Sequence, residues 1–321
     1  MKKSLLALAA TALLALPALA KTDAQSLIPS DAVTVGVVHL DEMRSSPLSG
    51  ALFQQTDKIT ADGDGAQFLL DAGLKPSQDI DVIVVATTLK TALGKDADVV
   101  IAADGRFNVD RLSAALVTRG AVKSGGYYIL PEKKESSETS KRGAVAFPNG
   151  HLVIVGTEEG VKNALAAYAA GGTNFATAGA LGHDMSRIDP KATAWALVDV
   201  VRAQRIVGSP HLSANSQAGA AVNTALKNVS TVAIWGIDTG DTVKLGAFGL
   251  SNDEETLQLL EDTLRGALSA MRLAIQDKQP DMVSVLRRFS VSRSNGSVTI
   301  SGSVPADTFR KYAAEHHKNS K

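Results

Sequence analysis

Two short polar motifs recur at corresponding places in the chain, and their residue types could bind a ligand. Asp41-x-x-Arg44 and Asp199-x-x-Arg202 each follow a run of β-forming residues, and binding side chains gather in such loops. His39 precedes the first motif and could orient a catalytic base. The structural alternative is an ion pair between residues three apart on a helix, with an ordinary half-buried sheet histidine beside it. We treat these five residues as candidate polar ligand positions and favour the structural alternative for each.

The rest of the sequence lacks the signatures of common enzymes. It contains no G-x-S-x-G nucleophile elbow, and none of its six histidines has the spacing of a helical metal site. His183-Asp184 follows a glycine-rich stretch and is interpreted as a surface turn. Asp62-Gly63-Asp64-Gly65 resembles the start of a calcium loop but lacks the third acidic ligand and the final glutamate. The sequence therefore predicts no catalytic residue, no metal and no cofactor.

The elements that position these residues occur twice along the chain. Each copy has the order strand, helix, strand, strand, helix, hairpin, helix. An Asn-Gly pair marks the hairpin in both copies, Asn149-Gly150 and Asn295-Gly296. The other expected strands span 33–40, 81–87 and 99–103 in the first copy, and 192–198, 231–237 and 243–250 in the second. Agreement in order and content predicts an internal duplication.

The pattern predicts an α+β fold of two tandem copies, with mostly antiparallel sheets and helices on one face. The first copy spans 21–172 and the second 191–315. A Gly/Ala-rich linker at 173–190 joins them, and a basic tail follows at 316–321. Whether the copies share one sheet or pack as separate domains is left open by the sequence.

The first twenty residues have the three parts of a cleavable secretory signal. Lys2 and Lys3 precede an uncharged apolar run, which ends at Pro17 before the small residues Ala18 and Ala20. The run is shorter than the roughly 20 residues that span a bilayer. The chain contains no cysteine, so neither a lipid anchor on cysteine nor a disulfide can form. We expect a periplasmic protein that is not a lipoprotein.

The charge and aromatic content exclude several partner classes. Lysine plus arginine equal aspartate plus glutamate at 33 each, and loss of Lys2 and Lys3 with the signal leaves a slightly acidic chain. Nucleic acids and anionic membrane surfaces select basic proteins, so neither is an expected partner. Aromatic residues make up only 4% of the chain, which disfavours a sugar-stacking site. No membrane span is expected after the signal is removed.

The chain resembles a loose group of exported bacterial proteins built on a duplicated α+β domain of unknown function. The resemblance rests on Ser46-Pro47-Leu48, on a Gly-Leu-x-Pro-x-x-Asp-Ile-Asp segment at 73–81, and on Gly105-Arg106-Phe107. It implies the architecture and an exported location. No activity is assigned to the group, so no functional residue can be transferred.

The leading hypothesis is a non-enzymatic binding or scaffold protein that holds a protein, a peptide or an apolar ligand. A large expected core and the lack of a catalytic constellation favour it. One alternative is a hydrolase of unrecognised type that assembles serine, histidine and aspartate in space. Another is a self-associating envelope assembly or stress factor that forms homo-oligomers.

Overall fold

The computed structural model describes residues 23–46, 49, 64–91, 96–131, 142–171, 173–207, 228–277, 279–294, 296–308 and 310–311. Several predicted segments lie outside these residues: the signal at 1–20, the helical stretch at 213–226, the basic tail at 316–321 and most of 48–63.

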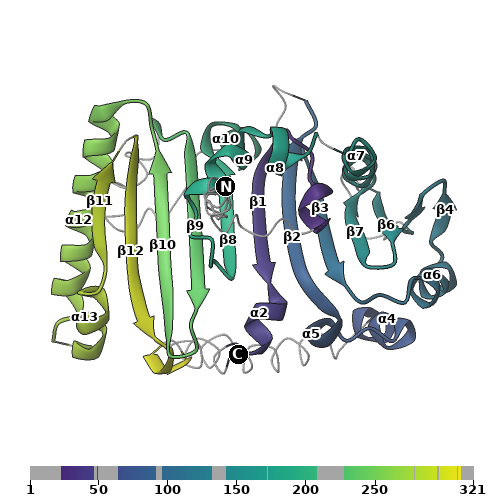
Figure 1. Ribbon diagram of the computed structural model, residues 1–321, viewed down its shortest axis with the longest axis horizontal. Helices are drawn as coiled ribbons and strands as arrows, with labels where there is room; N and C mark the ends of the chain where they lie inside the picture. Colours follow the sequence, from purple (N-terminus) through teal and green to yellow (C-terminus); the bar gives the residue numbers. More distant parts are fainter. Residues whose placement is uncertain are drawn as a thin grey trace, which may run out of the picture.

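The described strands form one twelve-stranded sheet in which every neighbouring pair is antiparallel (Figure 1). The order across the sheet is β11-β12-β10-β9-β8-β1-β2-β3-β7-β6-β5-β4. The first-half strands are β1 (Ala32–His39), β2 (Ile80–Leu89), β3 (Ala97–Gly105), β4 (Val122–Ser124), β5 (Tyr127–Ile129), β6 (Gly143–Asn149) and β7 (Leu152–Thr157). The second-half strands are β8 (Ala194–Asp199), β9 (Thr231–Asp238), β10 (Thr242–Leu250), β11 (Ser290–Ser294) and β12 (Ser297–Pro305).

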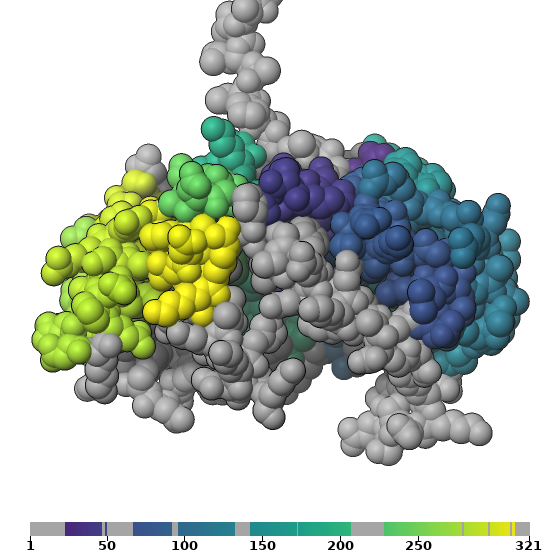
Figure 2. All heavy atoms as spheres, turned by 90° about the horizontal axis from the view of Figure 1, so that it is seen from below, coloured from purple at the N-terminus to yellow at the C-terminus, as the bar shows by residue number. Residues whose placement is uncertain are grey.

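The antiparallel α+β class predicted from the sequence is confirmed, and the two halves share a single sheet. They meet at the β1–β8 pair, where Val37 lies opposite Trp195. Outward from this pair, one half runs β1-β2-β3-β7-β6 and the other β8-β9-β10-β12-β11. Figure 2 shows blue residues of the first half at one end of the molecule, yellow residues of the second half at the other, and the purple residues of the first strand region between them. The internal duplication itself stays a prediction.

One side of the sheet, which we call the core face, carries the main hydrophobic core. Alternate side chains of a strand point to the same side, so Val35 and Val37 of β1 share this face with Val84 of β2, Leu197 of β8 and Ile154 of β7. All five are no more than 1% exposed. Burial of such side chains contributes about 1.5–3 kcal/mol each, so this face supplies much of the stability of the fold.

Short helices and α7 cover the core face. The elements are α1 (Asp23–Ser26), α7 (Glu158–Ala169), α8 (Phe175–Ala178), α9 (Ala180–Asp184) and the 3₁₀ turn η1 (Met185–Arg187). The last three lie within the segment predicted as a linker at 173–190. That segment folds against the sheet because its apolar side chains are needed there: Phe175 is fully buried and stacks on Trp195 with ring centroids 6.4 Å apart.

On the opposite side, which we call the groove face, the described helices lie toward the two ends. At one end α4 (Asp64–Ala72) and α6 (Val109–Thr118) pack on β6 and β7. At the other end α12 (Glu254–Ile275) and α13 (Pro280–Leu286) pack on β11 and β12. Helices therefore lie on both faces rather than on one, because both sets of alternating strand residues are apolar and need cover. The remaining described helices, α2 (Leu40–Arg44), α5 (Pro76–Asp79) and α10 (Val200–Val207), follow or precede strand ends.

Local signals fix where several elements begin and turn. The spacing of Ser251 and Glu254 predicts a cap at Ser251, but the side chain of Asp253 caps α12 by accepting hydrogen bonds from the backbone of its first turn. The two Asn-Gly turns also differ. Gly296 has φ +76°, whereas Gly150 is not a positive-φ glycine, and the Asn149 side chain instead accepts from the His151 N–H at 3.0 Å.

Candidate ligand-binding face

The structure does not bring the five predicted polar residues together. His39, Asp41 and Arg44 follow β1, while Asp199 and Arg202 follow β8. Because the neighbouring strands β1 and β8 are antiparallel, their carboxyl ends point in opposite directions, as the positions of α2 and α10 at opposite ends of the strands in Figure 1 show. The two motifs therefore cannot form one site.

Arg44 holds the first connection of the fold rather than a ligand. Its Nη1 forms an ion pair with Asp81 Oδ1 at 2.6 Å, and its Nε donates to the Ser77 carbonyl oxygen at 2.8 Å. A further bond reaches the carbonyl oxygen of Ile80. The predicted partner, Asp41, is exposed. Instead of the expected i,i+3 ion pair with Asp41, Arg44 forms an ion pair that links α2 to the start of β2.

The second motif and the histidine also have structural contacts. Asp199 caps α10 by accepting from the Arg202 N–H at 2.9 Å, and the two side chains lie 3.8 Å apart as an ion pair. The Arg202 guanidinium also donates to the Asp31 carbonyl oxygen. His39 is 7% exposed, and its backbone N–H donates to the Thr193 carbonyl oxygen at 2.8 Å. The structural alternative therefore accounts for the contacts of these residues.

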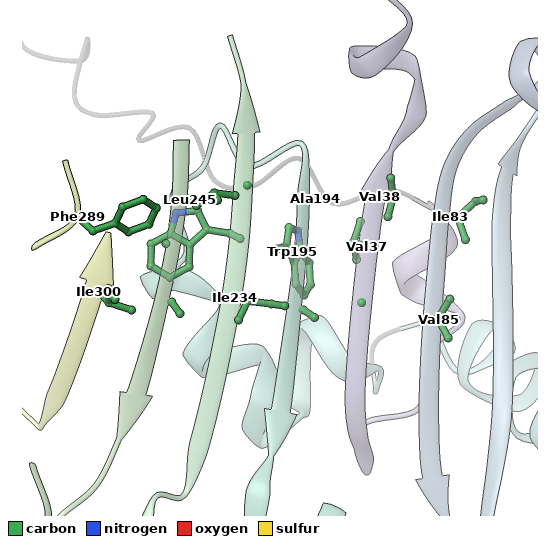
Figure 3. A pocket seen from close by; sticks show the side chains of 16 residues that line it. Val37, Val38, Ile83, Val85, Ala194, Trp195, Ile234, Leu245, Phe289 and Ile300 are labelled. Carbon is green, nitrogen blue, oxygen red and sulfur yellow. The ribbon is translucent and has the colours of Figure 1, made fainter. Parts of the chain in front are cut away.

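One hollow of the described structure lies on the groove face, between the two helical ends (Figure 3). Its volume is about 630 Å³, within the range of small-molecule pockets. Gly36 and Ala196 form part of a floor of small residues. Val85 lies on one side, and Leu245 and Phe289 lie on the other. None of the described residues that line this first cavity is charged.

A straight row of apolar residues crosses this face at right angles to the strands. Each member is the direct cross-strand partner of the next, in the order Ile300, Ala247, Ile234, Ala196, Gly36, Val85, Ile101, Val155. Ile234 is 57% exposed, and Val85, Ile101 and Val155 are 37–41% exposed. A contiguous exposed apolar strip of this kind marks an interaction surface.

A second cavity of about 790 Å³ lies on the same face, over β3, β7 and β6. It shares Ile83 with the first cavity, and both Ile101 and Val155 of the apolar row line it. Phe68 of α4 and Leu116 of α6 form its outer wall. The two cavities are therefore neighbouring parts of one apolar surface.

The one charged residue among the described lining of the second cavity is Arg119, directly after α6. Its guanidinium lies 5.6 Å from the centre of the Phe68 ring, and its Nη2 is 2.8 Å from Asp71 Oδ2. Arg111 Nη2 donates to the Asp71 carbonyl oxygen at 3.2 Å. Hydrogen bonds from Gln67 and Arg119 hold the pKa of Asp71 below its ordinary value. The described wall of the second cavity thus carries one guanidinium group, and this group is paired with the Asp71 carboxylate.

Other polar groups have structural partners away from the cavities. Asp98 is 2% exposed and accepts a hydrogen bond at 2.8 Å from Thr157 Oγ1, which also caps α7. Burial raises the pKa of Asp104, and the nearby carboxylate of Asp23 adds to the rise, while His151 opposes it. No group of three metal-ligating side chains occurs within the part of the chain that the structure describes. No described helix has the length and apolar composition needed to cross a membrane.

Comparison with known proteins gives similarity to solved structures alone. No protein-family model matches the sequence, and no curated protein does. The chain is similar to crystal form I of TP0453, with a TM-score of 0.49 and 7% identity over 92% of this chain and 98% of that chain. Crystal form III of the same protein gives a TM-score of 0.49 and 9% identity over 89% and 96% of the two chains.

The groove face was missed in the sequence, although one signal pointed to it. A half-buried strand alternates apolar and polar residues, whereas 82–86 and 99–103 are apolar at every position. Such runs indicate strands that are apolar on both faces. The cross-strand register that aligns Gly36 with Val85 and Ala196 depends on the folded sheet and cannot be read from either run alone.

Proposed function

We propose that this protein is a non-enzymatic, exported binding protein that holds an apolar ligand against the groove face of its sheet. The observation that carries the proposal is the first cavity, which has the volume of a ligand pocket and described walls without a charged side chain. Burying a hydrocarbon there contributes about 25 cal/mol per Å² of apolar surface.

The floor of small residues is what gives the cavity its depth. A Cβ added to Gly36 would meet its nearest described neighbours at 3.8 and 3.9 Å, which are ordinary van der Waals distances, so a methyl group fits at this position. Larger side chains on both sides, such as Ile83 and Leu245, form walls for an inserted chain. The arrangement favours a slender apolar ligand over a flat polar one.

The exported location is part of the proposal and rests on the sequence of residues 1–20. The resemblance to exported bacterial proteins with a duplicated domain supports the same location. Mass spectrometry of the protein purified from the native envelope should find a mature chain that begins near residue 21. An intact residue 1 in the purified protein would contradict export by cleavage.

The binding proposal is tested with the neutral fluorophore N-phenyl-1-naphthylamine and the variant Ala196→Phe, which fills the cavity floor. The chain has two tryptophans, Trp195 and Trp235, and both lie in strands beneath the first cavity. We expect bound probe to brighten and to change their emission. The Ala196→Phe variant should weaken binding at least tenfold while melting within a few degrees of the wild type.

The matched control is Ala166→Phe, the same substitution at an exposed position of α7 on the core-face side, which should bind the probe like the wild type. If the wild-type protein bound no probe, the groove face would not be accessible to an apolar ligand, and the proposal would be refuted. Equal binding by the wild type and Ala196→Phe would place the probe elsewhere and would also refute it.

A further inference from the structure

The apolar row is long, narrow and continuous, which restricts the shape of its ligand. From Ile234 on β9 to Val155 on β7 it crosses five strand intervals of about 4.8 Å, or about 24 Å in total. At each step the residues are direct cross-strand partners, so no turn or polar side chain interrupts the row. A single extended hydrocarbon chain fits such a row, because it presents apolar surface along its whole length.

The two ends of the row differ in charge. At the β9 end, the described residues of the first cavity are uncharged. At the β7 end, the row enters the second cavity, where Arg119 forms part of the wall and is paired with Asp71. A guanidinium group binds a carboxylate with paired, charge-assisted hydrogen bonds. The row therefore has one end without a charged side chain and one end that carries a guanidinium group paired with a carboxylate.

We infer that the ligand is a single-chain fatty carboxylate, with its carboxylate at Arg119 and its alkyl chain along the row toward Ile234. This inference rests on the proposed function and specifies the ligand of the same face. Asp71 then has a defined effect: its carboxylate competes with the ligand for Arg119.

The first test uses substitutions at the Arg119 end of the row that should act in opposite directions. Displacement of N-phenyl-1-naphthylamine by dodecanoate gives Kd for the wild type, Arg119→Gln and Asp71→Asn. We expect Arg119→Gln to weaken dodecanoate at least tenfold, because the carboxylate loses its charged partner. Asp71→Asn should strengthen it severalfold. A merely structural ion pair would shift both variants in the same direction.

Two controls separate charge from general effects. The uncharged dodecan-1-ol should bind the wild type more weakly than dodecanoate, and it should bind Arg119→Gln as it binds the wild type. Arg187→Gln removes the same charge from an exposed position in η1 and should leave the dodecanoate Kd within twofold of wild type.

The second test measures the direction of the alkyl chain. In the wild type, each added methylene from octanoate to hexadecanoate should lower Kd by about fourfold. Gly36→Phe obstructs the middle of the row, three strands from Val155. Octanoate should bind this variant as it binds the wild type, whereas the gain from further methylenes should stop.

The outcomes distinguish this inference from the proposed function. If the probe binds but dodecanoate and dodecan-1-ol bind equally, the cavity holds an apolar ligand and the carboxylate assignment is overturned. Equal loss of octanoate and hexadecanoate in Gly36→Phe would overturn the direction of the chain. Absence of all binding, including that of the probe, would refute the proposed function itself.

Discussion

Alanine at Gly246 should destabilise the protein, whereas alanine at Gly36 should stabilise it slightly. Both glycines lie inside strands, where glycine costs about 0.5–1 kcal/mol relative to alanine through its unfolded-state freedom. They point to opposite faces of the sheet. Gly36 opens on the groove, and Gly246 lies under the ring of its cross-strand partner Trp235 on the core face.

The geometry gives the magnitude. A Cβ on Gly246 would lie less than 3.0 Å from three atoms of the Trp235 ring, which packs against Phe248 with centroids 5.9 Å apart. Overpacking of this kind costs about 1–3 kcal/mol. After the entropic gain, we expect Gly246→Ala to lose about 1–2 kcal/mol. Gly36→Ala should gain about 0.5 kcal/mol, because its new methyl group would meet its nearest described neighbour at an ordinary contact distance of 3.8 Å.

Differential scanning calorimetry and urea denaturation of the two variants provide the assay. At roughly 2–4 °C per kcal/mol, the two melting temperatures should differ by about 3–10 °C, with Gly246→Ala the lower. Tryptophan emission should shift in Gly246→Ala alone. Equal stability of the variants, or a less stable Gly36→Ala, would show that the two faces are wrongly assigned and would remove the basis for the groove.

Three further outcomes test the polar contacts. Arg44→Ala should lower the free energy of unfolding by about 1–2 kcal/mol in urea denaturation, because it removes a half-exposed ion pair and two hydrogen bonds to backbone carbonyls. Asp41→Ala, at an exposed position, should stay within about 0.5 kcal/mol of wild type. Thr157→Val should lower the free energy of unfolding by about 2–4 kcal/mol, since it removes a helix cap and the hydroxyl that is hydrogen-bonded to buried Asp98. Thr157→Ser keeps the hydroxyl, so a serine variant no more stable than the valine variant would contradict this account. Asp104→Asn should stabilise the protein at pH 7 but not at pH 3. Because the pKa of Asp104 is raised in the folded state, stability falls as pH rises from the ordinary aspartate pKa of 3.8 through the folded-state pKa, and the amide avoids this loss. Equal changes in stability at both pH values would argue against burial as the cause.

The sequence predicted most of the sheet because its signals are local. The strand expected at 231–237 is observed as Thr231–Asp238, and the strand expected at 243–250 as Thr242–Leu250. The missed elements are short and depend on tertiary contacts. Val122–Ser124 is a three-residue edge strand, and the helix at Phe175–Ala178 is held by a phenylalanine that the sheet buries completely.

The candidate site could not be predicted from sequence, since it depends on register. The apolar row combines residues from strands far apart in the chain: Gly36 has neighbours at positions 85 and 196. The sequence motifs pointed to polar residues instead, and three of these, Arg44, Asp199 and Arg202, have structural contacts beside strand ends. Arg44 forms its ion pair with Asp81 rather than with Asp41, because the folded chain brings the start of β2 beside α2.

The β1–β8 pair at the centre of the sheet has a consequence for how the polypeptide can be divided. Neither strand has a complete set of backbone partners without the other half of the chain, and an unsatisfied strand edge recruits whatever complementary strand it meets. Two fragments cut between β7 and β8 should therefore recombine when mixed, with Val37 restored opposite Trp195. Each fragment kept alone should pair with itself through the strand left bare. The middle of the sheet thus acts as an internal heterodimer interface, held together in the intact protein by covalent linkage.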